Sequence, residues 1–395
     1  MPVCPRVRRG NRVRWNPPAR KRIHFGRPRI VKPPTVYDVA ERAGVSIATV
    51  SRVLRSPDRV RPDTAARVEA AVRELGYVPS GAARGLAERR TGVLGLYLPG
   101  FDAIEDLTEI ELPETGGTDI VTDLGKTADD HIADLYFDEV VRGAELEAWR
   151  RGFALMVAVG RGSKSLQTFT DMAGRVDGLI VLARAVPDAV LKPLAARIPV
   201  VVLSSRGDYE EFDRVSVSNR EGMAALTDHV LTRTDGALVY LGGPEESPDA
   251  RDRRRGVRDA LEKHGRAEDM RWISDTFTRE TGRRVGRELA ELADAGGELP
   301  GAVLCGNDQM ALGVLDEFAA AGIEVPGRVL VSGFDGIPAA ALSSPRLSTV
   351  RQPIEDLGRA AIALLDERFQ EPAGEPRGVR LPVSVLLRES TEPAR

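Results

Sequence analysis

The side chains best suited to chemistry in this 395-residue chain lie in the stretch SIATVSR, residues 46–52. Arg52 carries a planar guanidinium that can donate two parallel hydrogen bonds to a guanine, while Ile47 and Ala48 suit contact with the methyl group of thymine. The other polar side chains of the stretch are hydroxyls: Ser46, Thr49 and Ser51. Hydroxyls bind phosphate oxygens and so fix the register on a duplex without reading its sequence. The stretch favours binding to double-stranded DNA.

Residues suited to catalysis or metal binding are few. The chain has four His and two Cys, and Cys4 and Cys305 lie in unrelated contexts without metal-type spacing. They predict neither a disulfide framework nor a zinc site, and they fit a reducing cytoplasm. A phosphate loop with Lys, a GxGxxG turn and a nucleophile elbow are absent from the sequence. We therefore expect no catalytic residue, no metal and no cofactor.

Three short helices are expected to position residues 46–52. Thr35 and Asp38 resemble a capping box at the start of the first helix, and Gly44 can end it. Ser46 can cap a second helix over 47–55, and Pro62 begins a third that ends at Gly76. The apolar positions expected to face inward are Val36, Val39, Ala40, Ala43, Val50, Val53, Leu54, Val68, Ala71, Val72 and Leu75. Such a trio predicts a helix-turn-helix, whose second helix enters the major groove.

Charge is distributed unevenly along the chain. Residues 1–90 carry 21 Lys/Arg and 7 Asp/Glu, a net of +14, so the remaining 305 residues carry 35 and 52, a net of −17. A basic head on an acidic body is typical of a protein that binds nucleic acid with one part only. The simpler alternative for the charge is a basic tail that binds no ligand. For the three helices, the simpler alternative is that they only cap the larger domain, with Arg52 as a solvated surface charge.

Two segments lack the pattern of a folded core. Residues 1–34 contain eleven Lys/Arg and no acid, so they are either a disordered basic arm or upstream sequence from a wrong start codon. Between Pro99 and Leu135 lie eleven Asp/Glu and one Lys, which predicts an acidic surface insertion at about 101–133. Its role is not legible from the sequence.

From Val93 onward apolar runs alternate with amphipathic stretches. The runs VLGLYLP, FALMVAVG, DGLIVLA, PVVVLSS, ALVYLGG, AVLCGND and VLVSGFD predict buried parallel strands. Helices are predicted near 135–151, 164–174, 188–196, 219–233, 250–264, 279–295, 309–321 and 355–369. This alternation predicts a doubly wound α/β architecture, and seven strands over about 300 residues suit two sheets better than one.

Longer motifs resemble the lac repressor–galactose repressor family. They are TVYDVAERAGVSIATVSRVL, RPDTAARVEAAVRELGYVPSGAARGL, RVDGLIVL, IPVVVLS, RVSVSN, LCGNDQMALGVL, LVSGFDGIP, LSTVRQPIEDLG and LPVSVLLREST, and they cover most of Thr35 to Thr391. The resemblance implies paired heads that read two half-sites of a near-palindromic operator. It also implies a hinge helix in the link 79–90, where Ala83 and Arg84 precede Leu86, a leucine that would wedge into the minor groove.

For the rest of the chain the resemblance implies a periplasmic-binding-protein-like unit of two lobes, joined by three crossing segments around a ligand. It points to Arg251, Asn307 and Asp335 as effector-binding residues, with Phe137 and Ser204 on the other lobe. From the residues alone, Arg251 would pass for a solvated charge, Asn307 for a strand-end turn and Asp335 for a helix cap. We expect a sugar effector. Because Ser204 replaces an Asp common in sugar-responsive members, a nucleoside, a sugar phosphate or another metabolite stays open.

These observations predict a DNA-binding transcriptional regulator, a repressor more than an activator, with an all-α head on a two-lobed α/β core. We expect a basic arm 1–34, a helix-turn-helix 35–78, a hinge 79–90, an effector and dimerisation unit 91–391 and a tail 392–395. Expected partners are operator DNA, a small-molecule effector and further copies in a homodimer or tetramer, in the cytoplasm at the nucleoid, with no membrane. The alternatives are a transport-type solute-binding protein, an enzyme on the same α/β fold and a corepressor-dependent regulator.

Overall fold

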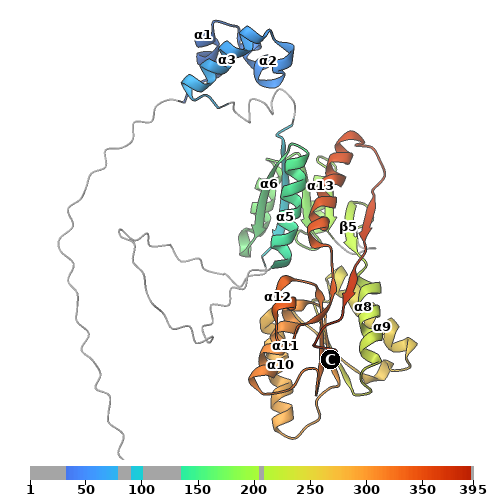
Figure 1. The fold of residues 1–395 in the computed structure, drawn as a ribbon. Helices are drawn as coiled ribbons and strands as arrows, with labels where there is room; N and C mark the ends of the chain where they lie inside the picture. The colour runs from blue at the N-terminus through green and yellow to red at the C-terminus, as the bar shows by residue number, and fades with distance from the viewer. Residues whose placement is uncertain (1–32, 79–89, 101–134, 204–208, 393–395) are drawn as a thin grey trace, which may run out of the picture. The chain divides into compact units, whose positions relative to one another are not determined.

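A computed structural model describes residues 33–78, 90–100, 135–203 and 209–392. The chain divides into two compact units, residues 1–80 and 81–395, and each is considered by itself. The described part of the first is all helical, and that of the second alternates strands with helices (Figure 1). This is the predicted combination of an all-α head with an α/β core.

The first unit is a three-helix bundle. It consists of α1 (Val36–Ala43), α2 (Ile47–Arg55), a 3-10 turn (Pro57–Arg59) and α3 (Pro62–Leu75). Its core holds the buried residues Val39, Ala40, Ala43, Val50, Val53, Val68 and Ala71, with Val36, Val72 and Leu75 packed against them. The inward orientation predicted for Leu54 is wrong, because this side chain is 36% exposed. Leu54 lies beyond the narrow face that a nine-residue helix can bury in so small a core.

The predicted helix ends are confirmed. The hydroxyl of Thr35 accepts from the N–H of Asp38 at 3.4 Å, and the N–H of Thr35 donates to the Asp38 carboxylate at 2.6 Å. Gly44 and Gly76 end their helices at a φ of 61° each, a left-handed conformation that costs glycine little. The turn from α1 to α2 is thus determined by residues next to it in sequence.

The second unit contains two sheets, each of six strands among the described residues. In the first, the order is β11-β5-β4-β3-β1-β2, and all described pairs are parallel. Its strands are β1 (Val93–Pro99), β2 (Ala154–Gly160), β3 (Gly178–Leu182), β4 (Val200–Leu203), β5 (Asp213–Val217) and β11 (Gly378–Leu381). The accompanying helices are α5 (Leu135–Arg150), α6 (Ser165–Ala173), α7 (Asp188–Ala195) and α13 (Ile354–Gln370). We call this the N-terminal lobe.

In the second sheet the order is β12-β10-β9-β8-β6-β7, parallel except for the antiparallel pair β10–β12. Its strands are β6 (Leu238–Gly242), β7 (Met270–Ser274), β8 (Ala302–Cys305), β9 (Leu330–Asp335), β10 (Ser348–Arg351) and β12 (Ser384–Leu386). Helices α8 (Asn219–Leu231) and α9 (Pro248–Lys263) lie on one side. Helices α10 (Arg279–Asp294), α11 (Asp308–Ala320) and α12 (Pro338–Leu342) lie on the other (Figure 1). We call this the C-terminal lobe.

Every predicted strand and helix of the core is present, and two sheets form as expected. Five further strands escaped the sequence pattern: β5, β7, β10, β11 and β12. Most of them carry polar or charged residues and only three to five positions, so no continuous apolar run marks them. The buried character predicted for the second run is wrong: β2 is the edge strand of its sheet and is largely half-exposed.

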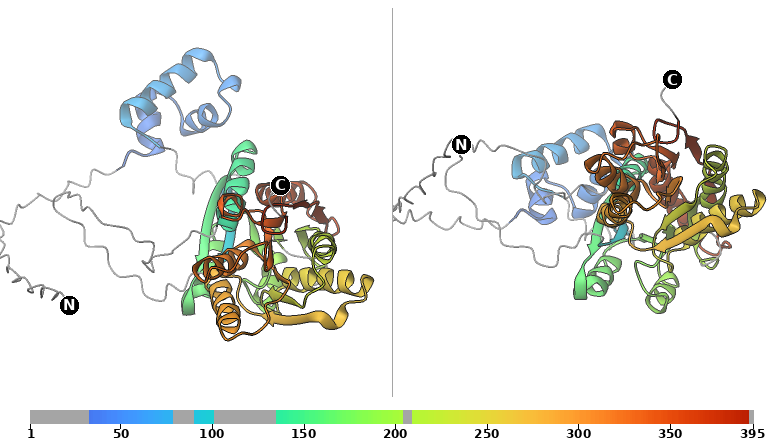
Figure 2. Two further views of the ribbon diagram at one scale, coloured as in Figure 1. Left: turned by 60° about the horizontal axis from the view of Figure 1, so that its bottom comes forward. Right: turned by 90° about the horizontal axis from the view of Figure 1, so that it is seen from below.

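The chain passes between the lobes three times, as the resemblance implies. The crossings run from β5 to α8 at 217–219, from β10 to α13 at 351–354 and from β11 to β12 at 381–384. The C-terminal segment, dark red in Figure 2, supplies β11 to the sheet of one lobe and β12 to the sheet of the other. The N–H of Ser218 in the first crossing donates to the carbonyl of Leu381 in the third at 3.0 Å. A main-chain hydrogen bond therefore ties the first crossing to the third.

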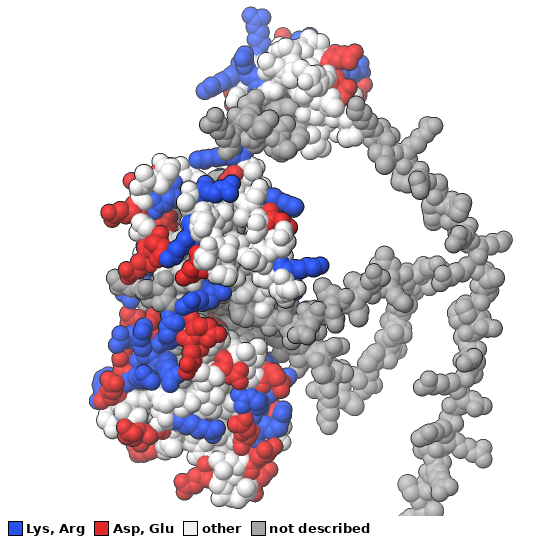
Figure 3. Space-filling view, turned by 180° about the vertical axis from the view of Figure 1, so that it is seen from behind, with Lys and Arg blue, Asp and Glu red and all other residues white. Residues whose placement is uncertain are grey.

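The face of the second unit drawn in Figure 3 carries acidic and basic side chains next to one another over both lobes. Many acidic and basic side chains of this unit form ion pairs, such as Arg220 with Asp259 and Arg279 with Asp316. Within the described residues, no helix combines the length and the apolar character that a membrane span requires.

Candidate nucleic-acid interface and effector site

Helix α2 presents the predicted DNA-contacting side chains on its solvent side. Ser46, Ile47, Ala48 and Arg52 are exposed, and Thr49 and Ser51 are half-exposed. The buried positions of the helix, Val50 and Val53, turn the opposite face to the core. The side chain of Ile47 is large and apolar, yet this residue is 38% exposed. The helix therefore offers a guanidinium, small apolar groups and hydroxyls on one accessible face, which suits the edges of base pairs in a major groove.

Two of the predicted DNA contacts also build the fold. The Ser46 hydroxyl accepts from the N–H of Thr49 at 3.2 Å and lies 2.9 Å from the Thr49 hydroxyl, so it caps α2. Thr35 caps α1 in the same way. An N-cap leaves helix N–H groups pointing outward at the start of a helix, where anions such as phosphates bind. The predicted hinge residues Ala83, Arg84 and Leu86 lie outside the described residues.

A buried polar cluster lies at the carboxyl ends of the strands of the C-terminal lobe. At its centre the guanidinium of Arg253, on α9, donates to the Asn219 amide at 2.8 Å and to the Gly306 carbonyl at 2.6 Å, and lies 3.3 Å from the Asp335 carboxylate. It stacks on the ring of Phe334, 3.9 Å from the centroid. Because the carboxyl ends of parallel strands are the usual ligand edge of an open α/β sheet, this cluster is the candidate effector site.

Asp335 is held in this cluster by an unusual backbone conformation. Its φ of 122° is one that residues other than glycine rarely adopt, and Gly336 follows at 78°. Strain of this kind costs about 1–3 kcal/mol and is concentrated at functional sites. The Asp335 carboxylate accepts from Gln352 Nε2 at 2.6 Å, and its carbonyl accepts from the Gln352 N–H at 3.0 Å. Gln352 belongs to the second crossing, so Asp335 is bonded directly to a connection between the lobes.

Asn307 joins the cluster from the start of α11. Its side-chain oxygen accepts from the N–H of Met310 at 2.9 Å, which makes it the N-cap of the helix. Its amide nitrogen donates to the Phe277 carbonyl at 3.0 Å, and the Phe277 ring lies 5.7 Å from the Arg253 guanidinium. The predicted residues Asn307 and Asp335 therefore both border Arg253.

Arg251 lies two residues before Arg253 on α9 and is half-exposed. Its guanidinium donates to the main-chain carbonyls of Glu245 and Glu246, at 3.4 and 3.0 Å. Arg253 is therefore the arginine whose bonds hold this cluster together, and the role of Arg251 in binding an effector stays a prediction. Helical periodicity would have distinguished them, because Arg253 falls with Ala250 and Val257 on the buried face of α9.

Sequence reasoning also missed Asn219, Phe277 and Gln352. Asn219 and Gln352 are buried polar residues at the ends of crossing segments, and no local motif marks such positions. Phe277 lies in a loop whose only signal is one aromatic residue among polar neighbours. Their roles arise from where the strands end in three dimensions.

Of the two effector-binding residues predicted on the N-terminal lobe, the structure describes Phe137. Phe137 is half-buried near the start of α5, and its ring packs edge-on against Tyr136 with centroids 5.2 Å apart. Ser204 lies outside the described residues.

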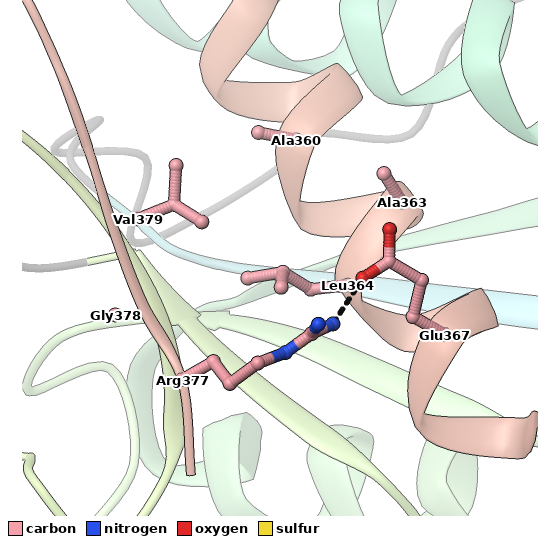
Figure 4. Close-up of a pocket in the computed structure, with 7 residues that line it drawn as sticks. All are labelled: Ala360, Ala363, Leu364, Glu367, Arg377, Gly378 and Val379. Carbon is pink, nitrogen blue, oxygen red and sulfur yellow. Dashed lines mark hydrogen bonds and ion pairs between the residues drawn. The ribbon is translucent and has the colours of Figure 1, made fainter. Parts of the chain in front are cut away.

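A separate pocket of about 280 Å³ lies between α13 and β11 in the N-terminal lobe. Figure 4 shows Arg377 paired with Glu367 across one side of it, with Leu364 and the alanines of α13 forming an apolar wall. None of the residues that line it belongs to the polar cluster. It contributes nothing to the candidate effector site.

Burial shifts the pKa values of two ionisable groups next to the cluster. Burial raises the pKa of the Asp308 carboxyl well above its usual range, and the nearby Asp335 carboxylate adds to this, while hydrogen bonds from Thr349, Ile337 and Gly336 oppose it. Burial also raises the pKa of the Cys305 thiol, which leaves it protonated at neutral pH. Among the described residues, no three His, Cys, Asp or Glu side chains are grouped to hold a metal ion.

Known families match both units of the chain. A family model described as "Bacterial regulatory proteins, lacI family" matches residues 35–80, and one described as "Periplasmic binding protein-like domain" matches residues 228–391. The first contains α1 to α3, and the second contains most of the C-terminal lobe and the residues of its polar cluster except Asn219.

Curated relatives span nearly the whole chain. The HTH-type transcriptional repressor CytR of Escherichia coli (strain K12) is 28% identical over 341 residues, 85% of this chain and 90% of the relative. The HTH-type transcriptional repressor PurR of Photobacterium profundum is 28% identical over 364 residues, 91% of this chain and 98% of the relative.

Solved structures agree with these relatives. A lac repressor dimer bound to operator and the anti-inducer ONPF has a TM-score of 0.73 at 25% identity, over 91% of this chain and 99% of that one. A complex of the transcriptional regulator CelR with cellobiose has a TM-score of 0.61 at 27% identity, over 90% of this chain and 99% of that one.

Proposed function

Because the chain belongs to the lac repressor–galactose repressor family of DNA-binding transcriptional regulators, we propose that it represses transcription from an operator under the control of a small polyhydroxylated effector. The members of this family regulate transcription and are not enzymes. The chain is therefore a transcriptional regulator, and its two units correspond to reading DNA and sensing a molecule.

The observation that carries the proposal is the exposed face of α2. Arg52 is an exposed cation beside Ile47 and Ala48, on a helix whose other side packs against the core. A helix with this surface, presented by a helix-turn-helix, reads base edges in the major groove. We assign base contacts to these three residues and phosphate contacts to Thr35, Ser46, Thr49 and Ser51. Within the same proposal, Ala83, Arg84 and Leu86 contact the minor groove.

Selection of bound duplexes from a random pool by the full-length protein tests this directly. We expect a near-palindromic consensus, since two heads would read two half-sites. Affinity for it should fall steeply with salt because each phosphate contact releases counterions. Failure to enrich any sequence near physiological salt would refute the proposal.

The effector class follows from the chemistry of the polar cluster. Guanidinium, carboxylate and amide groups can each bind two neighbouring hydroxyls, and Arg253, Asp335, Asn219 and Asn307 supply all three kinds. The related CelR was solved with cellobiose. We therefore propose a sugar effector held by Arg253, Asn307 and Asp335, with Phe137 and Ser204 as contacts from the N-terminal lobe. Titrating cellobiose, D-ribose and adenosine against the operator complex separates disaccharide, pentose and nucleoside effectors.

An exposed apolar surface on the N-terminal lobe supports assembly of two copies. Trp149 and Leu146 on α5 and Val157 on the edge strand β2 are exposed, Trp149 by 75%. Apolar groups this large at a sheet edge are typical of an interface between chains. We propose a homodimer, with a tetramer of two such dimers as the larger possibility. Val157→Asp should convert dimer to monomer in sedimentation, and an unchanged sedimentation coefficient would contradict this surface.

The finer division of the chain belongs to the same proposal. We assign residues 1–34 to an arm, 35–78 to the DNA-binding head, 79–90 to a hinge, 91–391 to the effector and dimerisation unit and 392–395 to a tail. A regulator of this family acts where its operator is, so we propose a cytoplasmic, nucleoid-associated protein.

A further inference from the structure

Asp308, the first residue of α11, is completely buried although it is an acid. One carboxylate oxygen accepts from the N–H groups of Gly336 and Ile337, at 2.7 and 3.0 Å. The other accepts from the Thr349 hydroxyl at 2.6 Å. Three donors therefore converge on one side chain that has no solvent-accessible surface, so Asp308 is unable to touch an effector itself.

The two N–H groups belong to the turn that follows Asp335. Successive main-chain N–H groups in a turn with left-handed residues form a concave nest that binds an anion. Asp335 and Gly336 have φ values of 122° and 78°, and the Asp308 carboxylate occupies the nest formed by the N–H groups after them. A side chain on Gly336 would lie 2.7 Å from Arg351, so glycine is required there. The turn is unfavourable by itself and is held by a carboxylate 28 and 29 residues before the two N–H groups that it binds.

The fold leaves room for this carboxylate. A Cβ atom on Gly333, in β9, would lie 2.3 Å from the Asp308 side-chain oxygen. The absence of a side chain at position 333 therefore creates the space that the acid fills. An acid buried only for the start of α11 would not need it, because Asn307 already caps that helix.

Asp308 also connects three elements that carry candidate effector residues. It directly follows Asn307, binds the turn directly after Asp335 and accepts from Thr349 on β10. Three residues beyond Thr349 lies Gln352, which donates to both the side chain and the main chain of Asp335. We infer that Asp308 is a positioning residue of the effector site: it fixes the turn that aims Asp335 at Arg253 and Gln352, and so links effector binding to the second crossing between the lobes.

This inference rests on the proposed function for its effector, but its geometric part can be tested without one. In the full-length protein, Asp308→Ala removes the acceptor for the N–H groups of Gly336 and Ile337. Hydrogen–deuterium exchange at these two amides should accelerate roughly tenfold or more, since a buried hydrogen bond is lost. Asp308→Asn should restore most of the protection, because the amide oxygen can accept from both N–H groups while its NH₂ donates to Thr349.

The matched control is Asp316→Ala. Asp316 lies on the same helix and pairs with Arg279 and Arg283, away from the turn. It should leave exchange at Gly336 and Ile337 unchanged even if it lowers overall stability. Unchanged exchange at these amides in Asp308→Ala would overturn the inference. If Asp308→Ala does not fold, Thr349→Val removes one of the three donors, and it should produce a smaller change than Asp308→Ala at the same sites.

The functional part uses operator release by cellobiose, D-ribose or adenosine, whichever acts on the unaltered protein. In Asp308→Ala, the ratio of the concentration needed for half-release to that of the unaltered protein should rise roughly tenfold, with rescue by Asp308→Asn. A purely structural role would not shift this ratio or be rescued. A response equal to that of Asp316→Ala overturns the inference. If none of the three probes acts on the unaltered protein, the proposed effector class fails, while amide exchange still decides the role of Asp308.

Discussion

The DNA-recognition face and the effector cluster are assembled over very different distances along the chain. The first consists of residues 46–52, neighbours on one helix, and most of its side chains are exposed. The second brings together Asn219, Arg253, Asn307, Asp335 and Gln352 from five elements and connections, all of them buried. A surface that must meet a large rigid partner can be local, whereas a site that surrounds a small molecule must be built from several directions.

The two regions also differ in what holds them in place. The head relies on caps such as Thr35 with Asp38, three residues apart. The effector unit relies on contacts between distant residues, such as Arg253 with Asp335 and Arg151 with Asp366. Substitutions in the head should therefore have small, local effects on stability. Those in the effector unit should have larger effects that extend through a lobe.

The largest effect is expected at Arg253. Arg253→Ala removes a buried guanidinium that bonds Asn219, Gly306 and Asp335, so the free energy of unfolding should fall by about 3–5 kcal/mol and the effector response should disappear. Arg251→Ala is the matched control two residues away and should cost less than about 1 kcal/mol. Chemical denaturation and effector-dependent operator binding measure the two quantities.

Arg253→Gln provides a second variant if Arg253→Ala fails to fold. It keeps a donor for Asn219 but not the charge, and it should fold with a weakened response. Loss of the effector response in Arg251→Ala, with a normal response in the Arg253 variants, would reverse the assignment of the effector arginine.

At the DNA-recognition face, Arg52→Ala should cost about 1–3 kcal/mol of operator affinity and relax preference at one base pair. Its stability should hardly change, because the side chain is exposed. Arg67→Ala, an exposed arginine on α3, should leave the ratio of operator to scrambled affinity unaltered. Binding isotherms on both duplexes test this, and an unchanged ratio in Arg52→Ala would remove Arg52 from base recognition.

An ion-pair network in the N-terminal lobe, centred on Glu147, should stabilise the fold to an extent that depends on pH. Hydrogen bonds from Arg150, opposed by burial and supported by Arg151, lower the pKa of Glu147 from 4.5 to about 2. A lowered pKa stabilises the fold above the unfolded value, and the contribution is lost as pH falls from about 5 toward 2. Glu147→Gln should therefore cost about 1–2 kcal/mol at pH 7, allowing for solvent screening, and almost nothing near pH 2.

Denaturation at several pH values checks this, with Glu145→Gln as the control. Glu145 is exposed on the same helix and should show no such convergence with pH. A difference between Glu147→Gln and the unaltered protein that stays constant from pH 7 to pH 2 would show that the ion pairs are not the cause.

The smallest effect is expected at the first helix cap. Thr35→Ala removes the acceptor for the Asp38 N–H and should destabilise the head by about 1 kcal/mol, while Thr35→Ser keeps the cap. Amide exchange within α1 of the full-length protein should report this change and leave the C-terminal lobe unaffected. Equal exchange in the Ala and Ser variants would mean that the cap does not hold α1.

Much of this architecture follows from local sequence signals. Alternating apolar runs and amphipathic stretches predicted all of the long helices and the seven most apolar strands, because burial imposes its own period on each element. The short strands β10 and β12 have no such signal, since they owe their pairing to neighbours that the fold brings alongside. Leu54 and β2 were assigned to the interior wrongly, because apolar character alone does not say whether a partner covers it.

The sequence by itself determined the recognition helix, its caps and the layered α/β plan, because each depends on residues within a few positions of one another. Only the tertiary structure decided which arginine of α9 faces Asp335, that Gln352 and Asn219 meet there, and that Asp308 braces the turn beside them. The physical reason is that a buried charge is tolerable only where several donors converge, and that convergence is made by strand ends that are far apart in the chain.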